Sequence, residues 1–114
     1  MNPLPAILLI CNRDPLFREA LRNFLLASGY REVAVAASVR DALTRLRRER
    51  YGYVVIGTLQ PFSRGRRLAF IARQRQPEAK IFCLVSAQDQ PFARVVSCEY
   101  VVKEHVFSNL LGLM

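Results

Sequence analysis

Several short apolar runs in this sequence are followed at once by residues that could form a binding site. These residues are Cys11, Asn12, Arg13, Gly57, Thr58, Ser86 and Lys103. Guanidinium, ammonium and hydroxyl groups are the ones that proteins use to hold phosphate oxygens. If the runs end at one place in the fold, Arg13, Ser86 and Lys103 form a positively charged pocket, and one function of such a pocket is to bind an anion such as phosphate.

Enzymatic chemistry has little support among the remaining nucleophiles and bases. Phosphatase loops that use a cysteine need an arginine six residues later and a run of amides around the anion. Phe17 holds that position after Cys11, and Arg18 is one place late. His105 has no paired acid or nucleophile, and no glycine-rich nucleotide loop occurs. We therefore expect no enzyme activity and no cofactor.

The cysteines are spaced too far apart to suggest a metal site. Cys11, Cys83 and Cys98 form no CxxC or Cys/His pattern. Apolar residues surround two of them, which is typical of buried thiols. We expect no bound metal.

Strands and helices that alternate along the chain would position the candidate residues. Continuous apolar or β-branched runs predict five strands, at 4–10, 32–36, 53–56, 81–85 and 100–102. A first helix begins at Pro15, with Asp14 as its cap and Gly29 after its end. A second helix is capped by Ser38, with Asp41 three residues on. Further helical segments are predicted at 66–74, as a short helix within 88–96, and at 105–113.

The apolar positions of the predicted helices repeat at helical spacing. The first helix would turn a stripe toward the core, and the second and third would do the same. The inward residues are Leu16, Phe17, Ala20, Leu21, Phe24, Leu25, Ala42, Leu43, Leu46, Leu68, Ile71 and Ala72. The stretch from Gly57 to Gly65, with Pro61 and Ser63, is predicted to be a loop.

This alternation predicts an α/β fold, a three-layer α/β/α sandwich around a five-stranded parallel sheet of the flavodoxin-like doubly wound type. Ligands of such sheets bind beyond the carboxyl ends of the strands, where the candidate residues would gather. The 114 residues are enough for one domain, spanning 1–114. We expect the fourth and fifth helices, within 88–96 and at 105–113, to be short.

Composition limits the function classes. The chain is 52% hydrophobic and 23% charged, which is typical of a globular protein. No apolar run is long enough to span a bilayer, and no signal-peptide pattern begins the chain, so we expect a cytoplasmic protein. The net charge of +8 comes mostly from arginine and favours an anionic partner. Most of these arginines are expected on solvated helix faces.

Four stretches resemble the receiver domains of bacterial two-component response regulators (CheY-like domains). They are Ile7–Leu21, Tyr53–Pro61, Pro77–Ala87 and Tyr100–Lys103, and the resemblance covers essentially the whole chain. It implies a regulatory signalling domain. The Asp14–Glu19 stretch is most similar to family members that carry a helix-turn-helix output domain.

The resemblance also implies a phosphorylation site that this chain has lost. The family uses two acidic residues to hold Mg²⁺, an aspartate nucleophile, a Ser or Thr, and a Lys. Here the acidic pair falls on Asn12 and Arg13, and the nucleophile position on Gly57, while Ser86 and Lys103 match. Asp14 and Thr58 are the nearest substitutes, but Asp14 is better explained as a helix cap.

Three interpretations of this degenerate pocket stay open. Arg13 could replace the metal as an electrostatic plug, or the pocket could bind an anion. In the third interpretation the site is vestigial, with salt bridges to Asp14 or Glu104. The switch aromatic of the family falls on Tyr100, so part of its relay is retained.

The segment between Ser86 and Lys103 is shorter than is usual in the family, which suggests a remodelled interaction surface. The candidate surface residues are Phe92, Val95, Val96, Val106 and Phe107, and the alternative is that they simply fill the core. We expect a phosphorylation-independent pseudo-receiver that works through protein–protein contacts, as a homodimer or with another signalling protein. It could regulate an attached DNA-binding domain. The alternative is a basic α/β module that binds nucleic acid directly.

Overall fold

The computed structural model describes residues 5–10, 15–57, 62–85, 99–102 and 106–114, without the side chains of residues 62–66, 85, 99, 100 and 102. Within these ranges a parallel sheet of five strands has the order β2-β1-β3-β4-β5. The strands are β1 (Ile7–Ile10), β2 (Val33–Ala36), β3 (Tyr53–Ile56), β4 (Lys80–Val85) and β5 (Glu99–Val102).

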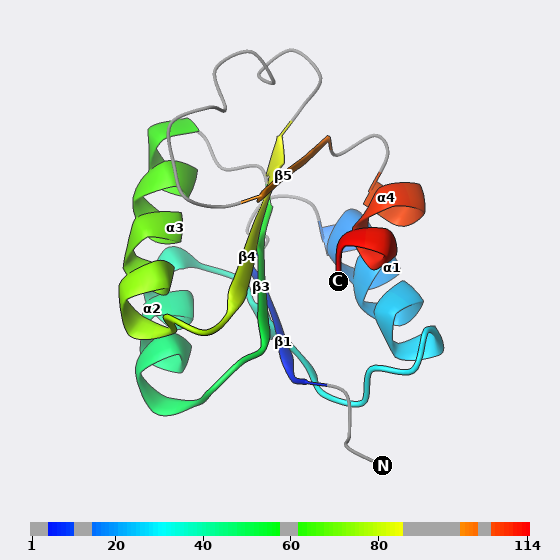
Figure 1. Cartoon of the computed structure of the whole chain (residues 1–114), viewed down its shortest axis with the longest axis horizontal. Helices are drawn as coiled ribbons and strands as arrows, with labels where there is room; N and C mark the ends of the chain where they lie inside the picture. The colour runs from blue at the N-terminus through cyan, green and yellow to red at the C-terminus, as the bar shows by residue number, and fades with distance from the viewer. Residues whose placement is uncertain (1–4, 11–14, 58–61, 86–98, 103–105) are drawn as a thin grey trace.

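Four helices cover both faces of the sheet. They are α1 (Pro15–Ala27), α2 (Val39–Arg48), α3 (Phe62–Arg75) and α4 (Val106–Leu113). Helices α2 and α3 lie on one face, and α1 and α4 lie on the other (Figure 1). The predicted α/β architecture with a parallel sheet is therefore confirmed. The predicted helical segment at 88–96 lies outside the described residues.

The two hydrophobic cores follow from the alternation of side chains along each strand. Leu8 and Ile10 of β1 face α2 and α3, whereas Ile7 and Leu9 face α1 and α4. All four are fully buried, which is why β1 reads as a continuous apolar run rather than an alternating one.

Local sequence signals account for several helix ends. The Ser38 side chain accepts a hydrogen bond from the Asp41 backbone N–H at 3.1 Å, as the capping pattern predicts. Gly29 follows α1 with a φ of 107°, a left-handed conformation that costs glycine little.

Several local predictions were wrong, and Ala20, which was predicted to face inward, is exposed. The first strand begins at Ile7 rather than residue 4, because Pro5 and Ala6 join no strand pairing. Helix α3 begins at Phe62 and not at residue 66, since one internal glycine costs only about 1 kcal/mol and burial of Leu68 and neighbouring alanines can offset it. Leu16 is 84% exposed because it lies at the edge of the apolar stripe that Leu21 and Leu25 bury.

Candidate functional site

The register of the sheet brings the candidate strand ends together. Ile10 of β1 pairs with Ile56 of β3, and Val85 of β4 pairs with Val102 of β5. The carboxyl ends of β1 and β3, and those of β4 and β5, therefore lie side by side at one edge of the sheet, the edge at which doubly wound folds bind ligands.

Gly57 is the candidate residue that the structure describes at this edge. It follows β3 directly and is buried. Its backbone N–H donates to the Ile10 carbonyl over 2.7 Å, which joins the ends of β3 and β1. The φ angle of Gly57 lies outside the left-handed region. Among the described glycines, Gly29 is the one with a positive φ. The backbone conformation at Gly57 therefore does not require glycine, and the sequence provides no side chain at this position.

The other predicted pocket residues, Asn12, Arg13, Thr58, Ser86 and Lys103, lie outside the described residues, as do Phe92, Val95 and Val96 of the predicted surface. Tyr100 lies in β5, and its side chain is not described. The arrangement of these side chains stays a prediction.

The predicted interaction surface needs one correction at helix α4. Val106 is fully buried among residues of β4, β5 and α1, so it belongs to the core and not to a surface. Phe107, the next residue, is 43% exposed because one step along a helix turns the side chain by about 100°. Its ring packs edge-on against Phe17 and Phe24 of α1, with centroid distances of 6.1 and 5.2 Å.

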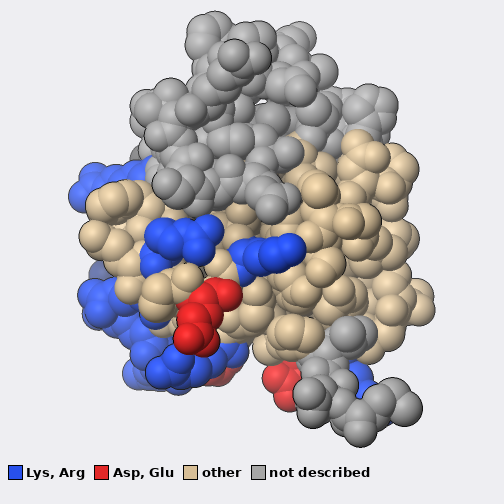
Figure 2. Space-filling view, viewed as in Figure 1, with Lys and Arg blue, Asp and Glu red and all other residues tan. Residues whose placement is uncertain are grey.

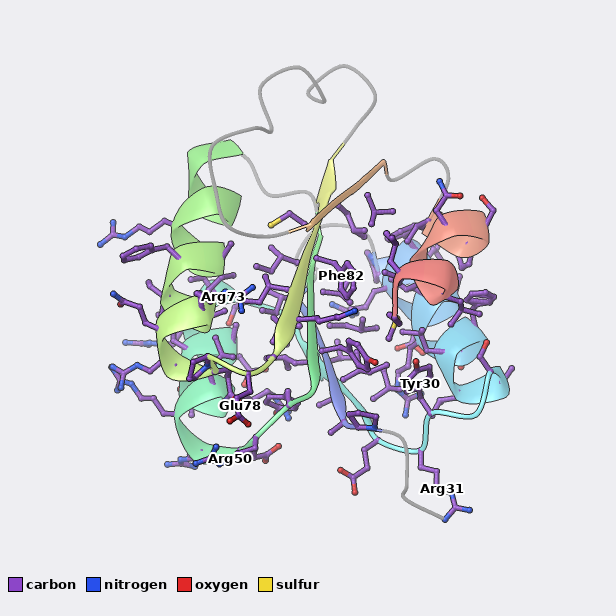
Figure 3. All side chains as sticks on the ribbon, in the orientation of Figure 1. Tyr30, Arg31, Arg50, Arg73, Glu78 and Phe82 are labelled. Carbon is purple, nitrogen blue, oxygen red and sulfur yellow. The ribbon has the colours of Figure 1, made fainter. Side chains whose placement is uncertain are left out.

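A concave region lies at the other end of the sheet, where the parallel strands begin. This cavity of about 620 Å³ is lined by Arg22, Arg31, Glu32, Glu49, Arg50 and Tyr51, with apolar residues of β1 and β2. Arg31 and Arg50 extend from separate loops at this end (Figure 3). The mixed charges and the location away from the carboxyl ends of the strands argue against the family's chemistry here.

Tyr51 borders this cavity, and its hydroxyl donates to the Glu49 carboxylate at 2.8 Å. Burial raises the pKa of Tyr51 to about 12, and the hydrogen bond to Glu49 adds to the increase. In the unfolded chain the phenol would ionise near its ordinary pKa of 10.0. The stabilisation is therefore complete below about pH 10 and is lost as the pH rises toward about 12.

We expect Tyr51→Phe to remove this dependence on pH. Between about pH 9 and about pH 11, the wild type should lose on the order of 1 kcal/mol more unfolding free energy than the variant. Urea denaturation of both proteins across this range measures the difference. Equal losses in the two proteins would show that Tyr51 ionises normally in the folded state.

Sequence reasoning missed the buried side chain of Gln76. It follows α3 and donates from Nε2 to the carbonyls of Leu46 and Glu49, at 3.0 and 2.7 Å, while Oε1 accepts from the Tyr51 N–H at 3.3 Å. Glutamine is usually exposed, so its residue type gives no signal for this role. The contacts tie the end of α2 and the start of β3 to the end of α3.

Solved structures with this arrangement are mostly response-regulator receivers. The response regulator TrrA of Thermotoga maritima, solved in complex with Mg²⁺ and BeF, matches with a TM-score of 0.79 and 26% identity, over 96% of both chains. A CheY-like receiver domain protein of Methanospirillum hungatei matches with a TM-score of 0.77 and 21% identity, over 95% of this chain and 89% of that one.

A more distant match is partial. An adenylate cyclase structure from Rhodopirellula baltica matches with a TM-score of 0.64 and 24% identity, over 77% of this chain and 64% of that chain. No family model matches the sequence, and no curated protein matches it. Among the described residues, no helix is long and apolar enough to cross a bilayer. The chain has the fold of the CheY-like receiver domains of response regulators, and it is similar to them over nearly its whole length.

Proposed function

We propose that this protein is a pseudo-receiver, a response-regulator signalling module that works without phosphorylation through contacts with other proteins. The observation that carries the proposal is Gly57. It is buried at the carboxyl end of β3, where the resemblance to receivers places the aspartate nucleophile. Glycine has no side chain to accept a phosphoryl group.

The residues at this edge also do not fit the Mg²⁺ ion of the family. Mg²⁺ prefers carboxylate oxygens, and Gly57 provides none at the end of β3. The resemblance places the acidic pair on Asn12 and Arg13, which bring an uncharged amide and a fixed cation. A guanidinium would repel a divalent cation, so no step of the proposed function passes through a metal.

The proposed partners are a second copy of this chain or another signalling protein, and an attached DNA-binding domain is part of the proposal. Support comes from exposed apolar side chains on α1 and α4, namely Leu16, Phe107, Leu111 and Leu113. Helix α4 contains no charged residue, and Figure 2 shows few blue or red atoms where α4 faces the viewer, which suits a protein contact. A cytoplasmic location is part of the same proposal.

A second candidate function is direct binding of nucleic acid. Blue basic side chains gather over the α2–α3 side in Figure 2. A basic surface of this kind would bind duplex phosphates, with an affinity that falls steeply as salt is added.

The test of the main proposal uses beryllofluoride with Mg²⁺ as a phosphoryl mimic, followed through backbone amide NMR shifts. We expect no saturable shift at Gly57 in the wild type. The Gly57→Asp variant should also give none, because Asn12 and Arg13 still fail to hold the metal. TrrA, which was solved with Mg²⁺ and BeF, is the positive control.

A triple variant makes this prediction stricter. Providing all three carboxylates, with Asn12→Asp, Arg13→Asp and Gly57→Asp, should give a response to Mg²⁺ and beryllofluoride, because the nucleophile and the acidic metal ligands would then all be present. A saturable response centred on Gly57 in the wild type would overturn the pseudo-receiver proposal. A response in Gly57→Asp alone would overturn the metal argument.

A further inference from the structure

The net charge of the protein is located in one continuous segment. Residues 39–75, which contain α2, β3 and α3, hold ten arginines and two acidic residues, a formal charge of +8. The other 77 residues hold seven basic and seven acidic side chains and are neutral overall. Because α2 and α3 form one layer of the fold, the described arginines of these two helices gather on one side of the molecule (Figures 1 and 2).

An apolar groove runs between these two helices. It has a volume of about 430 Å³ and is lined by Val39 and Leu43 of α2 and by Arg67, Leu68 and Ile71 of α3. Leu68 is buried beneath it, whereas Val39, Leu43 and Ile71 are half-buried and keep part of their surface in water. Phe70 is 57% exposed on α3, three residues after Arg67. The surface thus offers apolar area that the fold itself does not cover.

Exposed arginines frame the groove on both helices. On α2, Arg40 precedes Leu43 by three residues and Arg47 follows it by four, so both neighbour Leu43 on the helix surface. On α3, Arg67 and Arg75 lie four residues before and after Ile71. The set of Arg40, Arg47, Arg67 and Arg75, with the groove between them, is called the α2–α3 groove below.

The four framing guanidinium groups have no carboxylate partner among the described residues. Asp41 pairs with Arg45 at 3.3 Å, and the Glu49 carboxylate accepts from Tyr51. Like charges that crowd one side repel one another and destabilise the folded state. An anionic partner would relieve this repulsion, so its binding should also stabilise the fold.

We propose that the α2–α3 groove binds an acidic amphipathic helix of a partner protein, with apolar side chains in the groove and carboxylates on the framing arginines. The proposal rests on the function proposed above, because it names the partner of a protein-interaction module. An amphipathic helix presents apolar anchors at i, i+3, i+4 and i+7, which suits a groove between two helices. Arginine binds carboxylates through two parallel hydrogen bonds, which fixes orientation as well as affinity.

The lining of the groove favours a protein over a nucleic acid. Valine, leucine and isoleucine offer no flat ring on which a base could stack, and base stacking is how single strands use apolar surface. A duplex would engage the arginines through its phosphates and leave the aliphatic groove without a partner. A helix with a leucine ridge uses both features at once.

The test uses a fluorescent peptide of about 18 residues, with leucines on one helical face, glutamates on the other and alanines between them. A second peptide has the same composition, with the leucines distributed around the helix. Binding is measured by fluorescence anisotropy at about 0.15 M salt, where surface charges are screened beyond about 8 Å. A duplex DNA of equal charge is titrated in parallel.

Two pairs of exposed basic residues provide matched variants. Arg47→Glu with Arg67→Glu changes the groove, and Arg31→Glu with Lys80→Glu changes the net charge equally at positions outside residues 39–75. We expect the groove variant to weaken peptide binding by at least about tenfold and the control by less than about twofold. Ile71→Ser, which changes no charge and removes a side chain that lines the groove, should also weaken binding. Thermal denaturation confirms that each variant folds.

Equal losses in both double variants would overturn the proposal, because they would show nonspecific charge attraction. The same holds if the scrambled peptide binds as well as the amphipathic one, or if only the duplex binds and the groove variant abolishes that binding. The NMR titration with Mg²⁺ and beryllofluoride described above is made on the same protein. A saturable shift at Gly57 in that titration would overturn the pseudo-receiver function, whatever the peptide result. Failure of the amphipathic peptide to bind, without such a shift, would overturn only the proposal for the groove.

Discussion

Replacing Gln76 with leucine is expected to lower the free energy of unfolding by about 3 kcal/mol. The substitution keeps most of the side-chain volume but removes hydrogen bonds to Leu46, Glu49 and Tyr51. Gln76 is 7% exposed, so water cannot fully replace the lost contacts. Unpaired backbone groups in such a site each cost about 1–3 kcal/mol, and partial relaxation brings the total below their sum.

Urea denaturation followed by circular dichroism measures this loss. Gln74→Leu is the matched control, because Gln74 is exposed in the last turn of α3, two residues earlier, and it should change stability by less than about 0.5 kcal/mol. Gln76→Glu should be nearly as damaging as the leucine variant, since a carboxylate cannot donate to two carbonyls. A leucine variant as stable as the control would show that the three contacts contribute nothing.

Replacing Phe82 with alanine is expected to cost about 4 kcal/mol, a typical value for removing a buried phenylalanine. Phe82 lies fully buried on β4 between the sheet and the layer of α1 and α4 (Figure 3). Its ring centroid lies 6.3 Å from that of Tyr53, whose ring packs edge-on against Tyr30 at 6.0 Å. The cavity would therefore open beneath a connected group of aromatic rings.

The effect should extend to the last helix. The Tyr53 hydroxyl donates to the Met114 carbonyl at 2.9 Å, so a displaced Tyr53 would loosen the end of α4. Near-ultraviolet circular dichroism of the tyrosines should weaken together with the unfolding free energy. Phe70→Ala, at an exposed position, should stay within about 0.5 kcal/mol of the wild type. Equal effects at Phe70 and Phe82 would contradict this account of the core.

The sequence alone predicted much of the fold because its signals are local. β3 was predicted at 53–56 with the bounds that the structure shows, since a buried central strand is continuously apolar. The Ser38 cap was also predicted correctly, because a cap involves residues three apart in the chain. At the candidate site, the loss of a carboxylate at the end of β3 follows directly from the identity of Gly57.

Burial within one helical turn could not be predicted in the same way. Val106 and Phe107 are adjacent apolar residues, and the sequence assigned both to one candidate surface. The structure buries Val106 and leaves Phe107 partly exposed, because the docking angle of α4 decides which side faces the sheet. That angle depends on contacts with α1, which is distant in the chain.

Residue types and their local spacing thus determined the carboxyl ends of the strands, the Ser38 cap and the absence of a nucleophile at Gly57. Only the tertiary structure decided the role of Gln76, whose hydrogen-bond partners lie 25 to 30 residues away. It also decided that the described arginines of α2 and α3 lie in one layer of the fold, with an apolar groove between the two helices. The physical reason is the same in both cases. Hydrogen bonds, burial and charge depend on distances in space, and the packing of helices onto the sheet sets those distances.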